Sequence, residues 1–102
     1  MINLFEKNLA GTAHLRAHRI TISNPYNGKP SVAYEMESVA VDASLGEVHF
    51  TDPGIGFDFD PADEFQMLDP ATGDPIPGLT MTQGMLQAAL FSLWVNKVNQ
   101  RG

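Results

Sequence analysis

The C-terminal segment 82–100 contains no proline, and its pattern predicts an amphipathic helix with a broad apolar side. When successive residues are placed about 100° apart, the large apolar side chains of this segment cover an arc of roughly 200°. A stripe of about 100° is enough to dock a helix on one core. The segment therefore predicts more apolar surface than one small domain can cover, and we expect the excess to bind protein. The expected interface residues are Leu86, Leu90, Phe91, Trp94, Val95 and Val98.

Length and charge limit the number of domains and the classes of partner. The chain has 102 residues, which predicts a single domain over residues 1–102. Twelve acidic and six basic residues give a net charge of −6, which repels nucleic acid and anionic lipid. No apolar run approaches the roughly 18 residues that cross a bilayer. We therefore expect neither a nucleic-acid partner nor a membrane partner, and the absence of cysteine excludes disulfides and thiolate ligands.

Alternating apolar and polar residues predict several strands before residue 60. In the strand expected over residues 14–23, the apolar residues before His18 and those after it fall on opposite faces. A β-bulge near His18 would bring them onto one face. Asn27-Gly28 is expected to reverse the chain through positive φ angles into a strand over residues 31–41. Two more strands are expected over residues 47–51 and 55–59.

The segment 52–80 is rich in acidic residues, proline and glycine, and we predict ordered turns over residues 60–78. Residues 1–12 are a possible N-terminal arm or first strand. Thr82 can cap the helix 82–100 through its hydroxyl. Strands followed by one helix predict an α+β fold, with an antiparallel sheet of about four strands and the C-terminal helix packed on it.

The densest group of candidate ligands is a run of acidic residues with no base between them. Oxygen ligands at alternate positions suit a hard cation, but the run lacks the central glycine and distal glutamate of a calcium-binding loop. No spacing in it selects the two carboxylates of a glycosidase. We expect a solvated outer face, and a bound cation or a charged contact with a partner stays open. The acidic residues are Asp52, Asp58, Asp60, Asp63, Glu64, Asp69 and Asp74.

Other catalytic and ligand patterns are incomplete. His14 and His18 lack a third ligand, and a strand would hold them about 13 Å apart. His49 is expected at the rim of the core. No serine stands in a Gly-x-Ser-x-Gly elbow, and Gly54-Ile55-Gly56 lacks the lysine of a phosphate-binding loop. The sequence therefore predicts no enzyme, and no catalytic, cofactor-binding or metal-binding residue.

Three segments carry a resemblance to a known class of proteins. They contribute, in order, a strand that ends in a Phe-Asp-Pro corner, an Asp-Pro-x-Thr-Gly turn, and a Thr-Gln-capped helix with a small-small-apolar-aromatic-Ser core. Over residues 55–95 the chain resembles small proteins encoded among the structural genes of tailed bacteriophages. Gly84 and Trp94 depart from that pattern, because an acidic residue and a tyrosine are common there. The segments are Phe57-Asp58-Phe59-Asp60-Pro61, Leu68-Asp69-Pro70-Ala71-Thr72-Gly73-Asp74-Pro75, and Thr82-Gln83-Gly84 with Ala88-Ala89-Leu90-Phe91-Ser92-Leu93.

The resemblance implies a virion protein of the tail, baseplate or connector, assembled in the host cytoplasm. Its expected partners are further copies of itself, other phage structural proteins, or both. A different class also fits the net charge, namely a small acidic inhibitor that mimics nucleic acid on a basic host defence protein. Such a mimic should spread its carboxylates along one face, whereas this chain gathers them in its turn-rich middle. We therefore expect the structural role.

Overall fold

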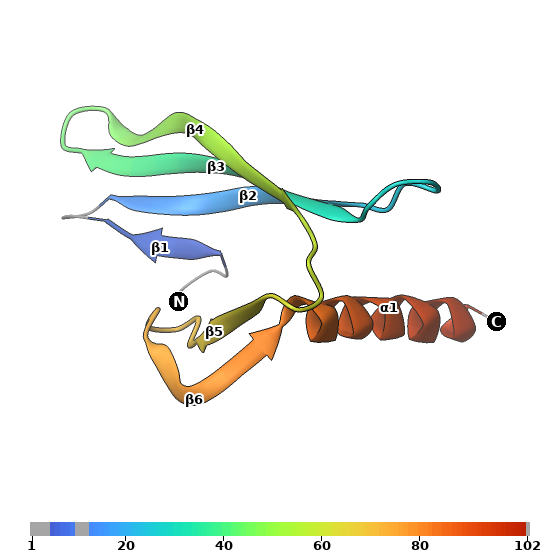
Figure 1. Cartoon of the computed structure of the whole chain (residues 1–102). Helices are drawn as coiled ribbons and strands as arrows, with labels where there is room; N and C mark the ends of the chain where they lie inside the picture. The colour runs from blue at the N-terminus through green and yellow to red at the C-terminus, as the bar shows by residue number, and fades with distance from the viewer. Residues whose placement is uncertain (1–4, 10–12, 102) are drawn as a thin grey trace. The chain divides into compact units, whose positions relative to one another are not determined.

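The structure is a computed structural model that describes residues 5–9 and 13–101. It contains six strands followed by one helix (Figure 1). The strands form an antiparallel four-stranded sheet in the order β1-β2-β3-β4 and an antiparallel two-stranded sheet, β5-β6. The predicted α+β class is confirmed. The elements are β1 (Glu6–Asn8), β2 (His14–Ser23), β3 (Ser31–Asp42), β4 (Gly46–Asp58), β5 (Glu64–Leu68), β6 (Pro75–Thr82) and α1 (Gln83–Gln100).

The chain divides into two compact units. Unit 1 comprises residues 1–58 and 70–73 and contains the four-stranded sheet. Unit 2 comprises residues 59–69 and 74–102 and contains β5, β6 and α1. The single domain over residues 1–102 stays a prediction. Of the possible N-terminal arm, residues 6–8 form β1 against β2, while residues 1–4 and 10–12 lie outside the described residues.

β2 contains the bulge that its sequence predicts. Its register with β3 shifts between Ala17 and Arg19, so His18 is an extra residue on β2. Since side chains alternate along β3, its residues 34 and 36 share a face, and the apolar residues on both sides of the bulge now lie against that face. The opposing pairs are Ala17 with Met36 and Ile20 with Tyr34.

The predicted hairpin between β2 and β3 is confirmed, with Ser23 opposite Ser31. Its turn is closed by a hydrogen bond of 3.4 Å from the Gly28 N–H to the Pro25 carbonyl oxygen. The expected positive φ angles at Asn27-Gly28 are wrong, because the described glycines with positive φ lie elsewhere. Positive φ at both central residues is required by a two-residue type I′ loop, and the loop here is longer.

β4 passes without a break through Asp52-Pro53-Gly54, where the sequence predicts a turn between two strands, so that prediction is wrong. The register with β3 shifts here, between Tyr34 and Met36, and the one extra residue on β4 is absorbed as a bulge. A Cβ on Gly54 would lie only 2.8 Å from the Tyr34 carbonyl oxygen. Pro53 is tolerated because β4 is the edge strand of the sheet, where one ladder bond can be absent.

Unit 2 corrects the prediction of ordered turns over residues 60–78. β5 and the first half of β6 lie in this segment. Proline is tolerated in β6 because each strand of a two-stranded sheet is an edge, and Pro75 is the first residue of its strand. At the register shift between Gln66 and Leu68, the Gln66 side-chain nitrogen shares its two hydrogens among three carbonyl oxygens at 2.8–3.0 Å. Those bonds bind the backbone where the regular ladder is interrupted.

The helix begins where the sequence predicts. Thr82 is the N-cap residue of α1, and its hydroxyl oxygen accepts a hydrogen bond of 3.1 Å from the Met85 N–H. This bond satisfies one of the free N–H groups of the first turn. α1 follows β6 directly, with no loop between Thr82 and Gln83, and contacts that strand (Figure 1).

Candidate interaction surface

A loop of unit 2 fastens the first turn of α1. The Gln83 N–H donates to the Asp63 carbonyl oxygen at 2.8 Å, and the Gly84 N–H donates to the Pro61 carbonyl oxygen at 3.2 Å. The Gln83 side chain accepts from the Asp60 N–H at 2.8 Å and donates to an Asp63 carboxylate oxygen at 3.0 Å. The acidic loop and the helix start are therefore one bonded structure.

Gly84 allows this loop to approach the helix closely. A Cβ at this position would lie 3.0 Å from the Pro61 carbonyl oxygen and 3.2 Å from the Pro61 Cβ. A glycine inside a helix costs about 1 kcal/mol relative to alanine. Here the close contact with Pro61 explains the glycine.

The six helix residues predicted as an interface differ in exposure. Phe91 and Trp94 are each 62% exposed, and Val98 is 39% exposed. The rings of Phe91 and Trp94 lie next to each other, with centroids 6.1 Å apart. No described residue of α1 is buried. The half-buried members of the six are Leu86, Leu90 and Val95.

Two exposed apolar side chains of α1 are not among those six residues. Met85 is 58% exposed and Leu93 is 57% exposed. Lys97 is the one charged residue among the 18 of the helix. Phe91, Trp94 and Val98 recur at intervals of three and four residues and so share one side of the helix, whereas Met85 lies about 120° from Phe91 around its axis. Exposed apolar side chains that share one side are typical of binding sites on soluble proteins. The role of the six residues as an interface stays a prediction.

The four-stranded sheet of unit 1 has an apolar face of its own. Phe57 lies opposite Val32 and Ile55 lies opposite Tyr34, and the rings of Tyr34 and Phe57 stack with centroids 6.4 Å apart. Val32 is buried. Several large apolar side chains on this face are exposed, which makes it a second apolar surface. They are Ile22, Phe50, Ile55 and Phe57.

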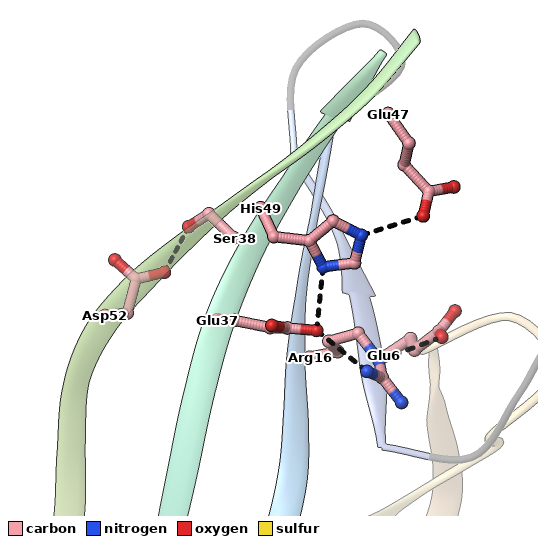
Figure 2. Close-up of polar contacts among 7 residues, drawn as sticks. All are labelled: Glu6, Arg16, Glu37, Ser38, Glu47, His49 and Asp52. Atoms are coloured by element: carbon pink, nitrogen blue, oxygen red, sulfur yellow. Dashed lines mark hydrogen bonds and ion pairs between the residues drawn. The ribbon is translucent and has the colours of Figure 1, made fainter.

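A row of charged residues crosses all four strands of unit 1, and we call it the charged row (Figure 2). It consists of Glu6 on β1, Arg16 on β2, Glu37 on β3, and Glu47 and His49 on β4. Within it, Arg16 contacts Glu6 at 3.5 Å and Glu37 at 2.8 Å. The two nitrogens of His49 lie 3.1 Å from Glu37 and 2.8 Å from Glu47. Most of these side chains, with His14 and Val39, line a recess of about 280 Å³.

Contacts within the charged row shift the pKa values of Glu37 and His49. The hydrogen bond from Arg16, followed by that from His49, lowers the pKa of Glu37. The hydrogen bonds to Glu47 and Glu37 raise the pKa of His49. A neutral imidazole has one N–H, so only the protonated ring can donate to both carboxylates. The charged row therefore favours the protonated form of His49. Its five side chains contact one another across the strands.

Periodicity along a single strand does not reveal the charged row, but the pairing of β2 with β3 does. Once the hairpin places Ser23 opposite Ser31 and the bulge at His18 is included, counting back along β2 places Arg16 opposite Glu37. Opposite charges at facing positions stabilise a pair of strands.

The predicted acidic run is divided between the two units. Asp52 and Asp58 belong to β4, and the Ser38 hydroxyl donates to the Asp52 carboxylate (Figure 2). Asp60 and Asp63 lie in the loop at the start of α1.

His18 lies at the bulge, which interrupts the alternation that would pair it with His14. Among the described residues, no group of three or more His, Asp or Glu could hold a metal ion.

Comparisons of the chain with protein-family models, curated proteins and solved structures find no match. Within residues 5–9 and 13–101, the helix is not long and apolar enough to cross a membrane.

Proposed function

We propose that this chain is a non-enzymatic structural subunit that assembles with other proteins through α1. The observation that carries the proposal is the exposure of Phe91 and Trp94, 62% each, on a helix with one charged residue. Aromatic residues are the commonest anchors of protein interfaces. Burying one such side chain contributes about 1.5–3 kcal/mol relative to leaving it in water.

The assembly that we propose is the virion of a tailed bacteriophage, at the tail, baseplate or connector. The support for this finer assignment is the resemblance over residues 55–95, which covers the loop, the two-stranded sheet and most of the helix of unit 2. In such an assembly unit 2 presents α1 to its neighbours. The charged row stabilises the sheet of unit 1 and has no part in the proposed binding.

Mass spectrometry of virions, purified from a lysate of the phage that encodes the chain, tests the proposal. We expect the wild-type chain in the virion at a fixed copy number relative to the other structural proteins. Phe91→Ala should reduce its incorporation, whereas Met85→Ala removes a similarly exposed side chain and serves as the matched control. Absence of the chain from virions, together with salt-sensitive capture of a basic host protein, would instead identify the acidic inhibitor.

A further inference from the structure

One stripe along α1 has the spacing of a coiled-coil seam. Its residues recur at alternating intervals of three and four, which keeps them on one side of a helix. Its centre is the exposed pair Phe91 and Trp94. Met85 and Leu93 lie outside it. The seam consists of Gly84, Gln87, Phe91, Trp94, Val98 and Arg101.

The two ends of α1 carry opposite charge. Asp60 and Asp63 lie at the start of the helix, held there by their bonds to Gln83. Lys97 lies in the last turn, and Arg101 is the C-cap residue. The helix between these ends is about 27 Å long at 1.5 Å per residue. Unit 2 therefore has an acidic end, a neutral apolar length and a basic end.

We propose that α1 pairs along this seam with α1 of a second copy of the chain, antiparallel and about a two-fold axis. An antiparallel pair brings the basic end of each helix to the acidic end of the other. A parallel pair would bring like charges together at both ends, which is destabilising. The pairing specifies a partner for the surface of the proposed function and rests on it.

In an antiparallel pair, the seam residues of one copy face seam residues of the other. With the two-fold axis between Ser92 and Leu93, Phe91 of each copy meets Trp94 of the other, and Gln87 meets Val98. The interface is isologous, so each of these layers occurs twice. Two aromatic pairs at its centre then bury the most exposed large apolar side chains of the helix.

The last layer of the seam explains the charges at its ends. Arg101 of one copy meets Gly84 of the other, and Gly84 contacts Pro61. Pro61 lies between Asp60 and Asp63 along the loop, so the guanidinium arrives beside two carboxylates. Ion pairs at the rim of an interface fix register and orientation more than they add affinity. A chain of net charge −6 repels its own copies, and the seam is a surface where that repulsion is reversed locally.

Trp94, the one tryptophan of the chain, reports the pairing directly. We expect sedimentation equilibrium of the full chain to give a dimer, and tryptophan emission to shift to shorter wavelength as the dimer forms. Phe91→Ala should weaken dimerisation about thirtyfold or more, the range of an interface anchor. Met85→Ala, outside the seam, should leave the dissociation constant unchanged. A monomer at all concentrations, or equal effects of the two variants, would overturn the pairing.

Added cysteines distinguish the two orientations, because the natural chain has none. In the antiparallel pair Q87C of one chain lies near V98C of another, within the range that a disulfide can bridge. Mixing the two variants should give the mixed disulfide, and neither variant alone should cross-link to itself. Self-linked Q87C and self-linked V98C would show a parallel pair and overturn the proposal.

The pairing and the proposed function can fail separately. A chain that enters virions through Phe91 but remains a monomer in solution and forms no mixed disulfide overturns the pairing alone. A chain that dimerises through the seam but is absent from virions supports the pairing and overturns the virion assignment.

Discussion

Replacing Gly54 by alanine tests how the bulge in β4 is held. The added Cβ would stand 2.8 Å from the Tyr34 carbonyl oxygen, a separation that real Cβ atoms do not show. The obstacle is backbone inside the β3–β4 ladder, so it can yield only if the strands move apart. Overpacking of this kind costs about 1–3 kcal/mol. The reduced freedom of the unfolded chain returns about 0.4–1 kcal/mol, so we expect a net loss of about 1–2 kcal/mol.

Gly56 provides the matched control. It lies two residues further along the same strand, but a Cβ there would be 3.7 Å from the Val32 carbonyl oxygen and 3.8 Å from the Ala33 Cβ, both ordinary contacts. Gly56→Ala should therefore be neutral or stabilising by up to about 1 kcal/mol. Urea titration followed by the amide NMR signals of β3 and β4 measures both variants within unit 1. Equal midpoints for Gly54→Ala and Gly56→Ala would refute the argument from close approach.

Three further changes test the charged row, the helix cap and a turn. Because the folded-state pKa of His49 is raised, its stabilisation is complete below about pH 6.5 and is lost as pH rises through that pKa. The urea midpoint of unit 1 should thus fall as the pH rises above about 6.5, and His49→Gln should reduce that fall; an unchanged pH dependence would contradict the assigned contacts. Thr82→Ala should cost unit 2 about 0.5–2 kcal/mol by urea titration with amide signals of α1, while Thr82→Ser should keep the cap; equal losses would exclude a role for the hydroxyl. Gly46 has a φ of 77°, so Gly46→Ala should cost about 1–2 kcal/mol, measured by the amide signals of unit 1, and no loss would show that the turn adopts another conformation.

The sequence predicted those parts of the fold that depend on local periodicity. The change of face at His18 is visible in the sequence because an uninterrupted strand would divide its apolar residues between two faces. The helix was predicted to within one residue of its start, because Thr82 precedes a long run without proline. Both signals arise within one element and need no knowledge of its neighbours.

The predictions that are wrong concern segments whose structure depends on a neighbouring strand. Proline and glycine at residues 53–54 and 75–78 indicate turns when read alone. In the structure they lie in edge strands, where a missing N–H is tolerated and a neighbouring side chain, such as that of Gln66, can bind the irregular backbone. The charged row was missed for a related reason, because Arg16 and Glu37 meet only when the register between strands is known.

For the candidate surface, the sequence predicted which residues are apolar but could not show how they divide on the helix. Exposure separates Phe91 and Trp94 from the half-buried Leu86 and Leu90. For the acidic residues near Gln83, the sequence predicts a solvated face. Their hydrogen bonds to the helix start depend on a loop conformation that periodicity does not report.

The direct passage from β6 into α1 has a mechanical consequence. Thr82 ends the strand and caps the helix, and the Asp60–Asp63 loop grips the next two residues, so the junction has little freedom to swivel. A force that turns the far end of the helix would also turn the two-stranded sheet, because no flexible linker separates them. A protein that binds the helix would therefore also fix the orientation of the β5–β6 sheet.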